Sequence, residues 1–201
     1  MKRGGFNLAE VLVVMALLGL IFAIVIAGFS AWRTKTTLRA TTRDIESTLK
    51  LARSKSLASE GGVRYGVLFS NQTTPHRYIL CKDPQLQGST YVCLTDFEIS
   101  RNDLPVNVSF CKSPGHETLV RSGSGTAPPT PIFAKLSGAY ENISGGAADG
   151  YVVIYNKSEI LGPDPCEGDM SVIDSCISSQ TCAAVKITRD GVVYERTSST
   201  P

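Results

Sequence analysis

The most distinctive hydropathy pattern is an uncharged apolar run at residues 11–29, VLVVMALLGLIFAIVIAGF. With Phe6 and Leu8 it supplies the roughly 20 apolar residues that a helix needs to cross about 30 Å of hydrocarbon. Lipid offers backbone groups no hydrogen-bond partners, so such a segment must be helical. The alternative is a buried core helix, which seldom lacks polar residues over this length. The pattern therefore predicts a membrane-spanning helix over residues 6–29.

A helical period continues over residues 30–59. Charged residues occupy most of the surface, and the apolar positions fall on one face: Leu38, Ile45, Leu49 and Ala52. The pair Gly61-Gly62 is a helix-stop signal. We expect an amphipathic helix over residues 30–59 whose apolar stripe packs on a sheet.

Beyond residue 62 the apolar runs are short and rich in β-branched and aromatic residues. The expected strands are residues 63–69, 78–81, 91–95, 106–110, 132–136, 151–155, 183–188 and 192–195. Asp190-Gly191 predicts a hairpin between the last two, Asp83-Pro84 predicts a turn, and residues 121–131 predict a loop. Residues 156–181 predict a long irregular segment. The fold class is therefore α+β: a long N-terminal helix, membrane-spanning in its first half, packs on an antiparallel β-sheet head at residues 60–201.

The first five residues form a short basic leader, MKRGG. A secretory signal has its small-residue cleavage site after the apolar stretch, whereas Gly4 and Gly5 precede it here. A cut after Gly5 would leave the apolar helix on the mature protein. The leader therefore indicates either an uncleaved anchor or processing on the cytoplasmic side.

A single acid, Glu10, lies near the start of the apolar segment. An ionised carboxylate in hydrocarbon costs a few kcal/mol, so it needs a partner, and no basic residue lies between Phe6 and Ala31. The nearest cation would be the α-amine of Phe6 after cleavage, supplied by a neighbouring copy. The alternative is that Glu10 sits at the headgroup level and contacts water.

The sequence GFNLAEVLVV at residues 5–14, followed by ALLG at residues 16–19, resembles the N-terminus of type IV pilins and type II secretion pseudopilins. The resemblance covers roughly the first 25 residues. It implies that prepilin peptidase cuts between Gly5 and Phe6 and methylates Phe6, and that Glu10 is the assembly residue. Asn7 and Ala9 depart from the commonest pattern, which has Thr and a larger aliphatic residue there.

Two further features bear on the kind of subunit. Residues 51–58 leading into 63–69 resemble the helix-to-strand passage of GspH/FimT-type minor pilins. No proline occurs before Pro75, whereas major pilins often carry a mid-helix proline, and this favours a minor pilin or pseudopilin. Small residues spaced by four would allow close helix packing, although such residues are also simply common in membrane helices: Gly19, Ala23 and Ala27.

The resemblance implies a structural subunit of a type IV pilus-like or type II secretion filament. Heterologous contacts between subunits do not close, so they propagate as a fibre. The implied partners are prepilin peptidase, other pilin or pseudopilin subunits, an inner-membrane assembly platform and the lipid bilayer, with no cofactor. Before assembly the chain would cross the inner membrane once, with its head outside the cytoplasm, and afterwards it would belong to a pilus or pseudopilus.

Charge divides unevenly along the chain. Residues 6–59 carry seven basic and three acidic residues, and residues 60–201 carry 11 basic and 15 acidic residues. A basic stem and an acidic head are compatible with contacts between subunits and are poor support for a nucleic-acid surface. The basic residues after the span oppose the positive-inside rule, but the six cysteines and the processing motif put the head outside. An alternative function is an adhesive minor pilin, or a tip pilin that binds DNA for uptake through Lys186, Arg189 and Arg196.

The six cysteines lie in the head: Cys81, Cys93, Cys111, Cys166, Cys176 and Cys182. An even number in an exported domain predicts disulfides, and six allow 15 connectivities. Cys81–Cys93 is favoured because residues 78–81 and 91–95 would pair across a hairpin. A second bond is expected within the group Cys166, Cys176 and Cys182, as pilins commonly have. Zinc is the alternative, but no CxxC spacing occurs and the chain has two histidines, His76 and His116.

Enzymatic motifs are absent from the sequence. The run SGSG at residues 122–125 does not follow a strand into a helix, as a nucleophile elbow would. The chain has no Walker loop and no dinucleotide-binding fingerprint. We therefore predict a protein that is not an enzyme and that binds no metal.

Overall fold

The computed structural model describes residues 8–58, 60–70, 74–87, 90–111, 131–141, 150–157 and 170–196, without the side chains of residues 25–28, 30, 31, 90, 140, 141 and 170–173. The chain divides into two compact units, Met1–Thr36 and Thr37–Pro201.

Helix α1 (Leu8–Leu57) runs through both units. Within the second unit, its apolar stripe faces the core of the head domain. Leu38 is 4% exposed, and the three positions that follow it on the stripe are fully buried: Ile45, Leu49 and Ala52. The predicted amphipathic helix is thus confirmed. Burial of its apolar face stabilises such a helix more than intrinsic helix propensity does.

The glycine pair ends the helical region, as expected. Helix α1 stops at Leu57 and is followed by a short 3-10 turn, η1 (Glu60–Gly62), in which Gly61 and Gly62 have φ values of 68° and 69°. Side chains other than glycine rarely adopt this conformation. The last turn of α1 is also tied to the head, since the Ser56 hydroxyl accepts a hydrogen bond of 3.0 Å from the Tyr65 amide.

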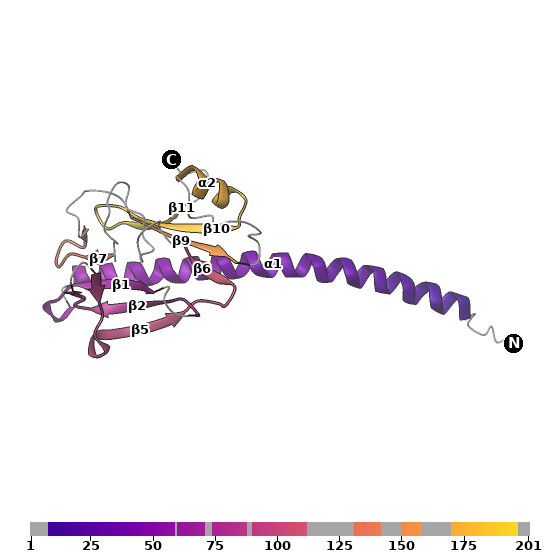
Figure 1. Cartoon of the computed structure of the whole chain (residues 1–201), viewed down its shortest axis with the longest axis horizontal. Helices are drawn as coiled ribbons and strands as arrows, with labels where there is room; N and C mark the ends of the chain where they lie inside the picture. The colour runs from indigo at the N-terminus through magenta and orange to yellow at the C-terminus, as the bar shows by residue number, and fades with distance from the viewer. Residues whose placement is uncertain are drawn as a thin grey trace. The chain divides into compact units, whose positions relative to one another are not determined.

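The strands form two antiparallel sheets and a separate hairpin (Figure 1). The five-stranded sheet has the order β5 (Glu98–Asp103), β2 (Arg77–Lys82), β1 (Tyr65–Ser70), β7 (Ile132–Phe133), β8 (Tyr140–Glu141). The four-stranded sheet has the order β11 (Val193–Arg196), β10 (Cys182–Ile187), β9 (Gly150–Asn156), β6 (Val108–Phe110). Strands β3 (Gln85–Gln87) and β4 (Thr90–Val92) pair only with each other, and a 3-10 turn, η2 (Thr95–Phe97), leads into β5.

One hydrophobic core joins the helix to both sheets. Figure 1 shows the last turns of α1 between the β1–β2–β5 layer and the β9–β10–β11 layer. The five-stranded sheet contributes Tyr65, Val67 and Leu80, and the four-stranded sheet contributes Ile154 and Val185. The predicted α+β class, with a helix packed on antiparallel sheets, is confirmed, but the head has two sheets rather than one.

A second apolar cluster covers the other face of the four-stranded sheet. Helix α2 (Met170–Ser178) packs there, and Ile177 joins Val153 and Ala184 in the cluster. The prediction of an irregular segment over residues 156–181 is therefore wrong for its last part. The serine-rich sequence MSVIDSCIS has weak intrinsic helix preference, and packing against the sheet supplies the missing stability.

The boundaries of several strands also differ from those expected. The sequence did not predict β3, β5 or β8. The strand expected at residues 132–136 ends at Phe133 because Leu136 lies in a turn with a φ of 67°. The β5 sequence EISRND contains three charged residues and an asparagine, which sequence propensity assigns to loops. Its hydrogen bonds to β2 override that preference.

The last hairpin is confirmed. Strands β10 and β11 pair antiparallel around Asp190-Gly191, and Gly191 has a φ of 76°. A Cβ at Gly191 would collide with the carbonyl oxygen of Gly138, so the close approach requires glycine. The Arg53 guanidinium of α1 donates a 3.1 Å hydrogen bond to the Asp190 carbonyl oxygen and holds the turn at the end of the helix.

Candidate functional site

The apolar part of α1 is exposed along its described length. Every described side chain of residues 8–24 is exposed, most of them large and hydrophobic. Trp32 is 62% exposed, and its ring centre lies 5.8 Å from that of Phe29. Within the described residues, no helix combines the length and hydropathy that crossing a membrane requires. The membrane span expected over residues 6–29, part of which lies outside the described residues, stays a prediction.

Glu10 is exposed in the first turn of α1. The negative carboxylate there interacts favourably with the positive end of the helix dipole. Glu10 makes no ion pair with the residues that the structure describes. A Cβ at Gly19 would meet no atom within 4 Å, and Ala23 is exposed, so both could approach another helix closely. Gly5, Phe6 and the side chain of Ala27 lie outside the described residues.

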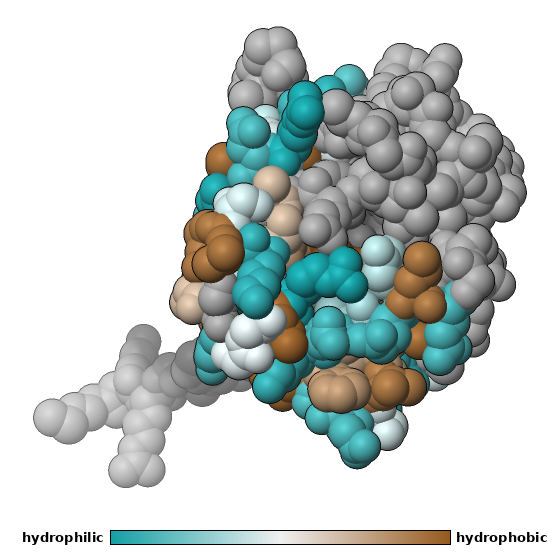
Figure 2. All heavy atoms as spheres, turned by 90° about the vertical axis from the view of Figure 1, so that its left-hand side faces the viewer, coloured by the Kyte–Doolittle hydropathy of each residue, from teal (hydrophilic) through white to brown (hydrophobic). Residues whose placement is uncertain are grey.

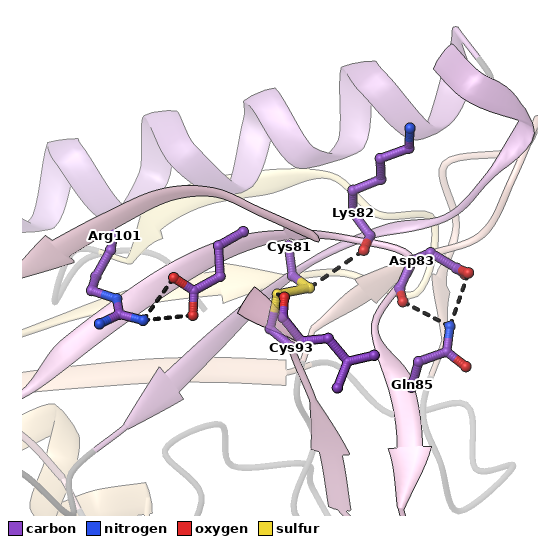
Figure 3. The surroundings of a disulfide bond; sticks show 8 residues. Cys81, Lys82, Asp83, Gln85, Cys93 and Arg101 are labelled. Atoms are coloured by element: carbon purple, nitrogen blue, oxygen red, sulfur yellow. Dashed lines mark hydrogen bonds and ion pairs between the residues drawn. A yellow bond between two sulfur atoms is a disulfide. The ribbon is translucent and has the colours of Figure 1, made fainter. Parts of the chain in front are cut away.

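The Cys81–Cys93 disulfide closes the base of the β3–β4 hairpin, with a Cα–Cα distance of 5.8 Å (Figure 3). The bond was expected, but the reason given for it is wrong. Strand β2 pairs with β1 and β5, whereas β4, which overlaps the expected strand 91–95, pairs with β3 and not with β2. Asp83 makes the expected turn with a φ of 49°, and its carboxylate accepts a 2.9 Å hydrogen bond from Nε2 of the Gln85 side chain.

A second disulfide, Cys176–Cys182, joins the end of α2 to the start of β10, with a Cα–Cα distance of 5.3 Å. It confirms the expected bond within the C-terminal cysteine group, of which Cys166 lies outside the described residues. Cys111 is also disulfide-bonded, which the sequence did not predict. The disulfides fix the hairpin and α2, neither of which has a large core of its own.

Three cations were considered for DNA binding: Lys186, Arg189 and Arg196. The structure brings Lys186 and Arg196 together on one tyrosine ring. The Lys186 ammonium lies 5.7 Å from the centre of the Tyr151 ring and 5.9 Å from that of Tyr194. Arg196 lies 5.2 Å from the same Tyr151 ring and forms a 3.0 Å ion pair with Asp174. Both cations are thus engaged by groups of the head itself, while Arg189 is exposed. DNA binding stays a prediction.

The hydrophobic residues exposed on the head are scattered. Figure 2 shows one face on which hydrophobic side chains stand as separate patches among hydrophilic ones. Of the residues considered for zinc, His76 accepts a 3.2 Å hydrogen bond at Nδ1 from the Phe110 amide, and His116 lies outside the described residues. No group of His, Cys, Asp and Glu in the described part of the chain is arranged to hold a metal ion.

Sequence patterns did not reveal a polar contact between α1 and the five-stranded sheet. The Tyr78 hydroxyl donates a hydrogen bond to the Asp44 carboxylate, and Tyr78 is almost fully buried. Burial, followed by this hydrogen bond, raises the pKa of Tyr78 above its ordinary value. Ionising the phenol would create a buried charge beside a carboxylate. A tyrosine on a strand and an aspartate 34 positions earlier give no local sign of this contact.

We expect alkaline pH to destabilise the head through Tyr78. Because its folded pKa is raised above the unfolded value of about 10, the stabilisation is complete below that value and is lost as pH rises through it. Tyr78→Phe should lower stability at neutral pH by roughly 1.5–3 kcal/mol and flatten the alkaline loss. Thermal unfolding followed by circular dichroism between about pH 8 and pH 11 measures both effects. Tyr194 is half-exposed, so Tyr194→Phe is the matched control. If Tyr78→Phe lost as much stability at alkaline pH as the wild-type chain does, the assignment to Tyr78 would be wrong.

Comparisons with known proteins give one structural likeness. No family model and no curated protein matches the sequence. Among solved structures, the minor pseudopilin EpsH from the type 2 secretion system of Vibrio cholerae superposes with a TM-score of 0.44 and 10% sequence identity. The superposition covers 81% of this chain and 98% of that one. A likeness at this TM-score carries no weight for function.

Proposed function

We propose that the chain is a structural subunit of a pilin-like or pseudopilin-like filament. The observation that carries the proposal is the N-terminal part of α1, where every described side chain of residues 8–24 is exposed and Glu10 is the lone charge. Such a surface cannot remain in water, because exposed apolar area costs about 25 cal/mol per Å². It requires either lipid or other helices as its surroundings, and a filament subunit uses both in turn.

Assembly would proceed in three steps. Prepilin peptidase removes residues 1–5 and methylates Phe6, while the apolar helix rests in the inner membrane. An assembly platform then extracts the chain. The helix joins those of other pilin or pseudopilin subunits, where Glu10 neutralises the N-terminal amine of a neighbour. The compact head, with its disulfides, decorates the surface as the minor-pilin resemblance implies.

Two measurements test the proposal: the identity of the N-terminal residue of the mature chain, and the presence of the chain in the filament fraction. We expect mass spectrometry of the full-length chain, purified from its host with a C-terminal tag, to find a methylated N-terminus at Phe6. We expect the same species in the filament fraction sheared from cells. Gly5→Val should keep the leader and remove the chain from that fraction. An unprocessed wild-type chain that stays out of the filaments would refute the function.

A further inference from the structure

Two arginines on the exposed side of α1 have no hydrogen-bond or ion-pair partner among the residues that the structure describes. Arg39 and Arg43 are exposed and make no hydrogen bond or ion pair with any residue that the structure describes. Between residues 37 and 57, all other charged side chains do have a partner: Asp44, Glu46, Lys50, Arg53 and Lys55. The described residues thus satisfy the other charges along this part of the helix and leave Arg39 and Arg43 without a partner.

The spacing of the two arginines concentrates their charge. Four positions apart, they lie one turn from each other on the same face, where like charges cost a helix roughly 0.2–0.5 kcal/mol. The neighbouring positions are small and exposed: Ala40 and Ser47. The Ser47 hydroxyl donates a 2.8 Å hydrogen bond back to the Asp44 carbonyl oxygen, so it does not compete for a ligand. We call Arg39, Ala40, Arg43 and Ser47 the arginine face.

The sequence contains a complementary segment. Residues 158–169 hold four carboxylates and no basic residue: Glu159, Asp164, Glu167 and Asp169. Residues 60–201 have 15 acidic and 11 basic residues. The four acidic residues of this segment therefore equal in number the acidic excess of the head. Guanidinium groups bind carboxylates through paired hydrogen bonds, with better geometry than lysine offers.

We propose that the arginine face binds the acidic segment 158–169 of a second copy of this chain. The inference rests on the proposed filament function, which brings copies side by side. Removing Lys2 and Arg3 with the leader leaves 18 basic and 18 acidic residues, so mature copies do not repel one another through net charge. Charge complementarity then determines which surfaces meet. Two copies of this chain are therefore neighbours in the filament.

A photo-crosslinking residue at position 43 of the full-length chain tests the contact in the host. We expect an adduct of twice the chain mass in the filament fraction. Trypsin should release the adduct on the peptide of residues 158–186, which lies between Lys157 and Lys186. An adduct within one chain, on another segment or on another protein would overturn the proposal. So would no protein adduct at all, which anionic lipid on the arginines would produce.

Charge reversal gives an independent readout. Arg39→Glu with Arg43→Glu should lower incorporation into filaments about tenfold at an unchanged cellular level of the chain. Reversing the four acidic residues 159, 164, 167 and 169 to lysine in the same chain should restore it. Lys50→Glu, which breaks a surface ion pair on the same helix, is the control and should have little effect.

Failure of the contact is distinguishable from failure of the function. A wild-type chain that enters filaments without the expected adduct, or a charge-reversed chain that is not restored, overturns the contact alone. A wild-type chain that never enters filaments overturns both.

Discussion

Glu10→Ala is expected to lower incorporation of the chain into filaments by roughly 60- to 300-fold. The variant leaves the N-terminal amine of a neighbouring subunit unpaired in apolar surroundings, which costs about 2.5–3.5 kcal/mol on insertion scales. Each 1.4 kcal/mol corresponds to about a factor of ten. The chain itself should accumulate normally, because Glu10 is exposed and contributes nothing to the core of the head.

The measurement is the ratio of tagged chain in the sheared filament fraction to that in the membrane fraction. Glu10→Gln should behave like the alanine variant, since it also lacks the charge. Glu10→Asp keeps the charge and should retain part of the incorporation into filaments. Glu46→Ala is the matched control on the same helix, since it removes a surface ion pair with Lys50. Wild-type incorporation of Glu10→Ala would show that the carboxylate merely contacts water.

Leu49→Ala is expected to destabilise the head by about 2–5 kcal/mol. Leu49 is fully buried at the point where α1 meets both sheets, so the deletion leaves a cavity that neither sheet can easily fill. At about 2–4 °C per kcal/mol for a domain of this size, the midpoint of thermal unfolding should fall accordingly. Near-ultraviolet circular dichroism of the full-length chain in mild detergent reports the loss of tyrosine packing.

The same helix offers a matched control for this prediction. Leu51, two positions further, is 46% exposed, so Leu51→Ala makes an identical chemical change and an identical change in helix propensity. We expect it to alter stability by no more than about 0.5 kcal/mol. Equal losses in the two variants would mean that helix propensity, rather than burial, sets the effect.

Periodicity predicted the helix well because the signal is long and redundant. The stripe from Leu38 to Ala52 spans four turns, and each of its positions indicates the same face. The glycine pair at 61–62 and the Asp190-Gly191 hairpin were also predictable, since each requires a backbone conformation that other residues avoid.

Long-range pairing accounts for what sequence could not predict. Cys81–Cys93 was expected for a hairpin that does not exist, because cysteine spacing does not reveal which strands lie beside each other. Strand β5 depends on β2 and not on its own residues, and α2 depends on the sheet beneath it. The partner of Tyr78 and the unmatched Arg39 and Arg43 likewise became visible only with the surroundings of the helix.

The shared core limits how the molecule can be divided. In the described strands the two sheets do not pair with each other, and both pack on the same stripe of α1. A fragment that begins at residue 60 would therefore lack the common wall and would expose the inner face of each sheet. An expression boundary for a stable head must precede Leu38. A substitution at Ile45 likewise has to suit both sheets at once, so we expect evolution to change their inner residues together.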